Sequence, residues 1–375
     1  MAHSYTPGLK VLHDTKISKD RILPLKGKVV VEAGQTVQPD DVVARTDLPG
    51  NIQMVNIANI LNIDPDDAKS VLTKEVGSTV KKGEIIAETK GLFGLFKSNV
   101  TAPIDCTIEA ISDVTGQAVL REAPIPVKVD AYMSGKVTRI LPEEGVTIET
   151  EGAFIQGIFG IGGENRGKLK LLVDSRDQEI TLDMITPDLK DLIIVGGAFI
   201  GLEAFKKAIE LQIAGIVVGG FNYSDLKSIL GYTLGVAITG SEDIGTSLIV
   251  TEGYGSIKMS DRTFDLLKQY EGSFASINGA TQIRAGVIRP EIVIPLNSDE
   301  LTGNVKEIHA AEGVTIGSLV RIIRAPYFGL LGKIVKLPPE LQQMESETMV
   351  RVAEVEIDGK IHSIPRSNLE MVETN

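Results

Sequence analysis

The sequence predicts a multidomain α+β protein, with a β-rich unit at residues 1–175, a small parallel α/β unit at 176–300 and a second β unit at 301–375. Four observations support this prediction. The chain has 375 residues, enough for two or three domains of roughly 150 residues. Its first third contains a repeat of short apolar strands, and its middle third changes to a strand, helix, strand pattern. Alternating apolar and polar residues near the end indicate further strands.

The composition excludes several classes of protein. With 43% hydrophobic and 23% charged residues the chain can fold, so general disorder is excluded. Its apolar stretches fall short of the roughly 20 residues that span a bilayer, and its N-terminus lacks the apolar core of a signal peptide. We therefore expect a cytoplasmic protein without membrane contact. The single cysteine, Cys106, excludes an internal disulfide, an iron–sulfur cluster and a zinc site, and we predict no metal site.

The first unit contains an internal repeat. Residues 32–47 read EAGQTVQPDDVVARTD and residues 75–90 read EVGSTVKKGEIIAETK, and the two segments align without a gap. Each copy predicts a glycine turn, at Gly34 or Gly77, followed by a short strand, a polar turn and a second, buried strand.

The second copy, followed by VTAPIDCTI at residues 100–108, resembles the hammerhead strands of biotinyl and lipoyl carrier domains, which are called barrel-sandwich hybrids. The resemblance covers residues 23–173 and implies that fold. Carriers of this family attach their cofactor to a lysine five residues before the valine of V-x-x-P. Here that position is Leu95, and Lys97 is out of register. We therefore expect a non-carrier version, with a swinging cofactor as the alternative; such versions occur in electron-transfer complexes, efflux adaptors and polymerases.

A glycine-rich stretch, GIFGIGGENRGK at residues 157–168, ends the first unit. It favours a hairpin between Phe154 and Leu169. The alternative is an anion site in which Arg166 and Lys168 add charge to exposed backbone amides.

The middle unit begins with a buried strand, Leu192 to Val195, followed by helical spacing from Phe199 to Ile209 and a second strand at residues 214–218. This order predicts a parallel pair joined by a crossover. The segment IIVGGAFIGLEAF resembles the dinucleotide fingerprint of flavin and nicotinamide reductases, which implies a Rossmann-like unit. Ala198 replaces the central glycine, so we expect no cofactor, with a nucleotide or flavin as the alternative. Helix amides near three glycines could hold an anion: Gly196, Gly197 and Gly201.

Two polar loops of the middle unit form a second candidate site. They are TEGYG at residues 251–255 and NGATQIRAGVIRP at residues 278–290. Loops at strand ends of open α/β sheets bind ligands, and two arginines can grip a carboxylate or phosphate. The candidates are Glu252, Asn278, Thr281, Gln282, Arg284 and Arg289. The alternative is structural, with Arg284 and Arg289 paired to Glu252 and Glu291. A helix is predicted at residues 261–270, capped by Ser260.

The last unit contains VRIIRAPYFGLLGKIVKL at residues 320–337, which resembles the KOW motif of NusG-type transcription factors and some ribosomal proteins. The resemblance implies a five-stranded SH3-like barrel, in which Asp358 and Gly359 form a hairpin turn. We expect an interaction face made of Arg321, Arg324, Tyr327, Gly332, Lys333 and Lys336. RNA and a protein both remain open as the partner of this face. The net charge of −12 opposes nucleic-acid binding elsewhere on the chain, so any contact with RNA would be local to this face.

Catalytic residues are not evident from the sequence. The four histidines are scattered, and neither a G-x-S-x-G elbow nor an H-E-x-x-H motif occurs. The sequence therefore favours a non-enzymatic scaffold or adaptor that docks onto a larger cytoplasmic assembly, with RNA or the transcription and translation machinery as a possible context. The alternative is a ligand-binding enzyme or electron-transfer subunit whose middle unit binds a nucleotide, flavin or small carboxylate.

Overall fold

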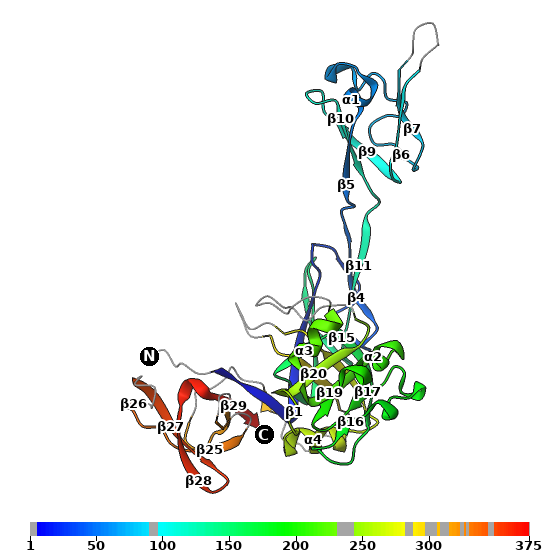
Figure 1. Ribbon diagram of the computed structural model, residues 1–375. Helices are drawn as coiled ribbons and strands as arrows, with labels where there is room; N and C mark the ends of the chain where they lie inside the picture. The colour runs from blue at the N-terminus through cyan, green and yellow to red at the C-terminus, as the bar shows by residue number, and fades with distance from the viewer. Residues whose placement is uncertain are drawn as a thin grey trace.

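The computed structural model describes residues 6–89, 97–230, 244–281, 288–296, 306–307, 315–322, 326–327, 330–343 and 349–374. It shows a β-rich protein of mixed α and β structure, with four α-helices among these residues. Figure 1 shows a body from which one lobe projects upward on a narrow connection, while another lobe lies beside the body. Among the described helices, none combines the length and apolarity needed to cross a membrane.

The base of the body is built on the long strand β1 (Thr6–Ile22). Its second half pairs antiparallel with β13 (Gly145–Gln156), which also pairs with β12 (Gly135–Leu141). Its first half pairs parallel with the last strand of the chain, β29 (Leu369–Thr374). Strand β1 thus links the base to the C-terminal part of the chain. The base is completed by β2 (Lys28–Val29), β3 (Thr36–Val37), β4 (Val42–Leu48) and β11 (Ile125–Asp130).

The distal lobe, residues 52–121, projects from the base between β4 and β11 (Figure 1). It contains a four-stranded sheet in the order β5, β10, β9, β6, and a hairpin of β7 and β8. Its elements are β5 (Ile52–Asn56), α1 (Ile57–Leu61), β6 (Thr79–Val80), β7 (Ile85–Glu88), β8 (Asn99–Thr101), β9 (Cys106–Ile111) and β10 (Gln117–Arg121). The lobe has its own apolar core, centred on buried residues such as Ile86, Ile108 and Leu120.

The two repeat copies adopt the same local structure in different lobes. The repeat glycine has a positive φ in both, 86° for Gly34 and 96° for Gly77. Its N–H donates at 2.7 Å to a neighbouring strand, to Val137 in the base and to Ile108 in the distal lobe. The same three positions are buried in each copy: Val37, Val43 and Ala44 in the base, and Val80, Ile86 and Ala87 in the distal lobe.

The α/β lobe, residues 159–281, contains parallel pairs of β15 with β17, β17 with β19 and β19 with β20. Its elements are β14 (Phe159–Ile161), β15 (Glu164–Leu171), β16 (Glu179–Ile180), β17 (Ile193–Val195), β18 (Phe199–Ile200), α2 (Leu202–Glu210), β19 (Gly215–Phe221), α3 (Tyr223–Leu230), β20 (Ser247–Tyr254), α4 (Asp261–Gln269) and β21 (Phe274–Asn278). The parallel pair and the helix α4 with its Ser260 cap are confirmed.

Two local predictions in this region are wrong. Phe199 is not helical, because residues 199–200 form β18 between β16 and β19, and α2 begins three residues later. The expected hairpin between Phe154 and Leu169 is replaced by an additional strand. The chain leaves β13, forms β14 against β20, and then forms β15, which pairs with β21 and β17.

The C-terminal lobe, residues 315–374, is a β structure around buried residues such as Val320, Ile334 and Val355. It contains β24 (Leu319–Ile322), β25 (Leu331–Lys336), β26 (Leu341–Gln343), β27 (Met349–Ile357), β28 (Lys360–Pro365) and β29. The predicted turn at Asp358 and Gly359 joins β27 to β28, and both residues have positive φ values. Between the α/β and C-terminal lobes runs β22 (Glu291–Pro295), which pairs with β13 and β21.

Candidate functional site

A buried ionic network joins the α/β lobe to the C-terminal lobe. Arg321 on β24 binds Glu252 on β20 at 2.7 Å, and also donates to the Thr251 carbonyl at 3.0 Å. Beside it, Arg289 binds Glu370 on β29 at 2.6 Å. The side chains of Arg321, Glu252 and Glu370 are each 4% exposed. Loss of one partner would leave a buried charge uncompensated, so the network holds the C-terminal lobe against the body.

The network corrects part of the predicted ligand site. Glu252 is not free to act as an acid or base, because its other oxygen accepts the Ser260 N–H at 2.9 Å. The structural alternative paired Arg284 and Arg289 with Glu252 and Glu291, and it is corrected for Arg289, which pairs with Glu370. These charged groups bind each other across two lobes, and this pairing replaces the predicted binding of a small anion.

Two glycines of the predicted anion site serve backbone packing. The N–H of Gly196 donates to β19 at 2.9 Å, and that of Ala198 donates to the Gln178 carbonyl at the same distance. A side chain at Gly197 would collide with the Gln178 carbonyl, so the glycine permits this close approach. The N–H of Gly196 is therefore already bonded, whereas the anion-binding role of Gly197 stays a prediction. Gly201 is the N-cap of α2, and its binding role stays a prediction.

The remaining candidates of this site support a turn. Asn278 accepts, through Oδ1, a backbone N–H two residues further on at 2.8 Å. The buried hydroxyl of Thr281 accepts the Gly160 N–H at 2.8 Å. Both side chains thus stabilise the connection after β21. Gln282 and Arg284 lie outside the described residues.

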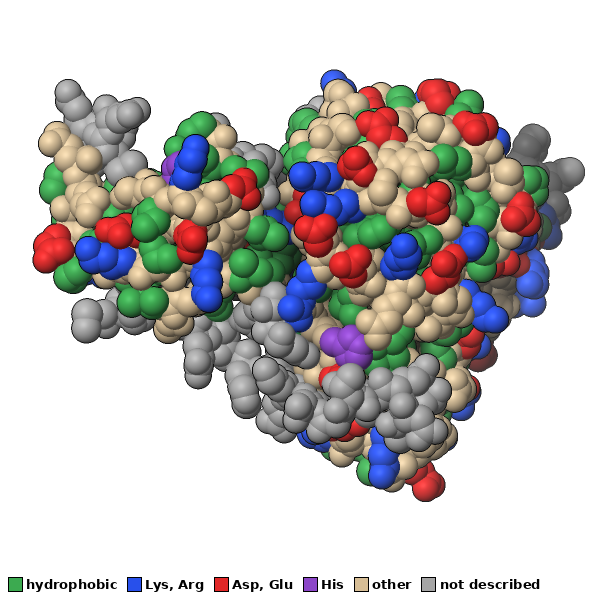
Figure 2. Space-filling model, turned by 90° about the horizontal axis from the view of Figure 1, so that it is seen from below, with side chains coloured by type: hydrophobic (Ala, Val, Ile, Leu, Met, Phe, Trp, Pro, Cys, Tyr) green, Lys and Arg blue, Asp and Glu red, His purple; other side chains and the backbone are tan. Residues whose placement is uncertain are grey.

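The predicted basic face of the C-terminal lobe carries both positively and negatively charged side chains. Lys333 and Lys336 on β25 are exposed, as expected. On the adjacent strand, Glu356 lies opposite Lys333, and Glu354 lies 3.6 Å from the ammonium of Lys336. Figure 2 shows cationic and anionic side chains interspersed over the lower face of this lobe and its neighbour. A polyanion would therefore meet carboxylates beside each lysine.

The other residues predicted for this face have different environments. Arg321 is buried in the network above, which corrects its assignment to an exposed surface. Gly332 is buried, and a Cβ there would collide with Val355. Tyr327 packs against His362, with ring centroids 4.6 Å apart. Arg324 lies outside the described residues.

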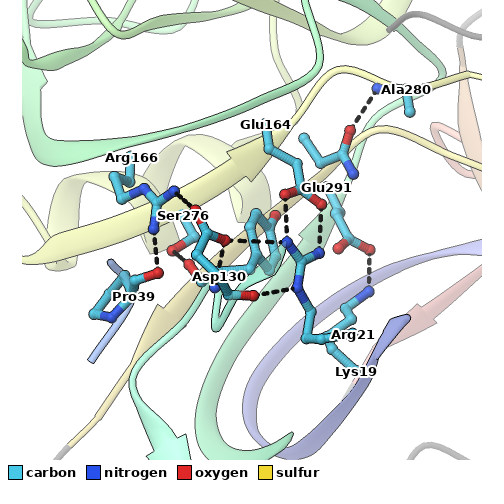
Figure 3. Close-up of polar contacts among 11 residues, drawn as sticks. Lys19, Arg21, Pro39, Asp130, Glu164, Arg166, Ser276, Ala280 and Glu291 are labelled. Atoms are coloured by element: carbon cyan, nitrogen blue, oxygen red, sulfur yellow. Dashed lines mark hydrogen bonds and ion pairs between the residues drawn. The ribbon is translucent and has the colours of Figure 1, made fainter. Parts of the chain in front are cut away.

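A second charged cluster joins the base to the α/β lobe, as Figure 3 shows. Arg21 on β1 binds both carboxylate oxygens of Glu164 at 2.7 and 2.8 Å, and donates to the Asp130 carbonyl at 2.8 Å. Arg166 on β15 binds the Asp130 carboxylate and the Pro39 carbonyl. Burial alone would lower the pKa of Arg21, but its hydrogen bonds and the nearby carboxylates outweigh that effect and raise it. The arginine therefore stays charged within this interface.

The sequence did not predict this second cluster. Of its residues, Arg166 alone was a candidate, as part of the alternative anion site at residues 157–168. The cluster draws on the base through Arg21 and Asp130 and on β15 through Glu164. Glycines next to Arg166 indicated an unusual backbone, but the spacing of these residues in the sequence carries no signal for their pairing.

The distal lobe is joined to the body by two chain segments, whereas the other lobes are joined by clusters of charged side chains. We call these two segments the neck, residues 49–51 and 122–124. Glu122 donates its N–H to the Asn51 carbonyl at 2.9 Å, and Arg121 donates to the Gly50 carbonyl at 3.0 Å. A side chain at Gly50 would collide with the Glu122 carbonyl, so the segments run very close together. Pro49 and Pro124 flank this point. The distal lobe is thus held by a narrow link.

Comparison with known proteins gives no relative: no family model matches the chain, and no curated protein matches it. Within the part of the chain that the structure describes, no three His, Cys, Asp or Glu side chains are grouped so as to hold a metal ion.

Proposed function

We propose that this protein is a non-enzymatic adaptor that docks a protein partner through its distal lobe while the body serves as a fixed platform. The proposal rests on one observation, that a lobe with its own core stands away from the body on a two-chain neck (Figure 1). A lobe built only for stability would bury surface against the body. This one leaves large apolar side chains exposed instead, among them Met54, Val76 and Val114.

The body supports this proposal through the ion pairs between its lobes. Two charged clusters fix the base, the α/β lobe and the C-terminal lobe to one another. Several residues that could have bound a ligand, including Glu252 and Arg289, are used in these contacts. The geometry therefore favours an adaptor over the alternative of an enzyme whose site lies in the α/β lobe.

A protein fits the exposed surfaces better than RNA does. The two exposed lysines of β25 each face a glutamate, and the whole chain carries a net charge of −12. Neutralising phosphates requires an uncompensated basic surface. The C-terminal lobe also exposes apolar residues, Leu341, Met349 and Ile361, which suit a second protein contact.

A lobe deletion tests the proposed function. Leu48 and Ile125 lie directly opposite each other in β4 and β11, so an Asn-Gly turn can replace residues 49–124 and close the hairpin. We expect native purification from cell extract to recover a stoichiometric protein with the full chain and not with the shortened one. The purified partner should rebind only the full chain. Recovery of the same proteins by both chains, or of none by either, contradicts the proposal, and a high absorbance ratio at 260 to 280 nm would indicate RNA instead.

A further inference from the structure

We propose that the free edge of β5 in the distal lobe pairs with β5 of a second copy of this chain, forming an antiparallel dimer centred on Met54. Strand β5 is at the edge of the four-stranded sheet, and β10 is its strand neighbour. Its side chains of Ile52 and Met54 are 51% and 63% exposed. An edge strand carries unpaired backbone groups that another strand can satisfy.

The hydrogen-bond pattern shows which backbone groups point outward. At one end of the pair, the N–H of Glu122 donates to Asn51, and at the other the N–H of Ile57 donates to Gly116. Hydrogen-bonded pairs alternate along an antiparallel ladder, so the odd-numbered residues of β5 bond to β10. The backbone groups of Ile52 and Met54 therefore face the open side, together with the N–H of Asn56.

These outward groups match those of an identical strand turned by a two-fold axis. With Met54 opposite Met54 of the second copy, each donates its N–H to the other's carbonyl. Ile52 then lies opposite Asn56, whose N–H meets the Ile52 carbonyl, giving four hydrogen bonds in all. The carbonyl of Asn56 is excluded from this count because Asn56 is the N-cap of α1, where it accepts the first helical bond.

Neighbouring edges of the molecule are protected, and β5 is not. The opposite edge of the same sheet, β6, has two residues and is followed by Lys81 and Lys82. The edge strand β11 contains Pro126 and Lys128. Short length, lysine and proline are the usual means of preventing edge pairing. Strand β5, with the sequence IQMVN, has no charge or proline, and its register along β10 is continuous.

Local charge does not oppose a second copy at this edge. A chain of net charge −12 repels itself over most of its surface, whereas β5 is uncharged. Beside it on β10, Arg121 is already paired with Glu109 at 2.6 Å. The two-fold pairing also places Met54 against Met54, next to the partly buried Val119 on β10. No like charges of β5 are brought together.

The projection of the distal lobe keeps the β5 edge away from the body (Figure 1). Strand β5 leads away from the body toward α1 (Figure 1). Since the two β5 strands run in opposite directions, the two bodies lie at opposite ends of the joined sheet. The resulting eight-stranded sheet would present two adaptor bodies from one centre.

Cysteine cross-linking tests the predicted register. In Met54→Cys, the two Cα atoms of the central pair would be about 5.5 Å apart, within disulfide range. In the matched control Ile52→Cys, the two cysteines would be roughly 14 Å apart, since each lies four residues from the other's partner. The native Cys106 is buried and does not compete. We expect mild oxidation to cross-link Met54→Cys and not Ile52→Cys; equal cross-linking of both would overturn the proposal.

Mass measurement on the full chain tests the association itself. We expect multi-angle light scattering to show a monomer at low micromolar concentration that becomes a dimer at several hundred micromolar. Met54→Pro removes one outward N–H per copy, none of it bonded to β10, and should raise the dissociation constant by about tenfold or more. Val114→Pro, at another exposed apolar residue of the distal lobe, is the control, and circular dichroism verifies folding. A monomer at every concentration, or a dimer that Met54→Pro leaves unchanged, would overturn the proposal.

Discussion

The C-terminal lobe and the distal lobe are attached to the same body in opposite ways. The C-terminal lobe shares β1 with the base and is held by buried ion pairs of Arg321 and Arg289. The distal lobe is attached through the neck, whose two segments are joined by hydrogen bonds of Asn51, Arg121 and Glu122. The C-terminal lobe is therefore positioned by contacts with the rest of the chain, whereas we expect the distal lobe to open as a unit of its own.

The largest effect is expected from Arg321→Ala, which breaks the C-terminal attachment. Removing the guanidinium leaves Glu252 buried without its ion-pair partner, so the free energy of unfolding should fall by about 3–5 kcal/mol. Urea denaturation followed by circular dichroism measures the loss. The control is Lys336→Ala, whose pair with Glu354 is exposed and should contribute about 0–1 kcal/mol. Equal losses in the two variants would show that the buried network does not hold the lobe.

A core substitution in the distal lobe should affect that lobe alone. Ile108→Ala removes a fully buried side chain and should destabilise the lobe by about 2–5 kcal/mol. Cys106, the single cysteine, reports on this lobe, because burial raises the pKa of its thiol and keeps it protonated while folded. We expect alkylation of Cys106 to accelerate by roughly one to three orders of magnitude.

The matched variant for this prediction is Ile148→Ala, in the core of the base. It should lower the stability of the body and leave the alkylation rate of Cys106 nearly unchanged. If both variants accelerate alkylation equally, the neck transmits stability between the lobes and the distal lobe does not open independently.

The smallest loss of stability is expected on substitution of the repeat glycines, which occupy equivalent turns in the base and the distal lobe. Gly34 and Gly77 both have positive φ, and a Cβ at either would have room, so Ala adds backbone strain of about 1–2 kcal/mol and little else. Gly77→Ala should accelerate alkylation of Cys106, and Gly34→Ala should instead lower the urea midpoint of the body. A reversed assignment would mean that the equivalent turns do not belong to separate folding units.

Much of the local structure could be predicted because its causes are local. The two copies of the repeat have the same turns and buried positions because glycine, apolar and polar residues recur in the same order. Helix α4 begins where Ser260 caps it, and the turn at Asp358 and Gly359 uses residues that tolerate positive φ. The candidate ligand site was less predictable, because the same arginines and glutamates suit an anion or each other.

The repeat, the buried strands, the capped helix and the hairpin turn follow from the order of residues, since each depends on residues within a few positions of one another. Contacts between distant segments of the chain account for the pairing of β1 with β29, the ion pair of Arg321 with Glu252, and the position of β5 at a sheet edge. Phe199 shows the same limit, because strand pairing overrode its helical spacing. Ion pairs and strand pairings form between groups that lie close in space, and the order of residues along the chain does not show which distant groups these are.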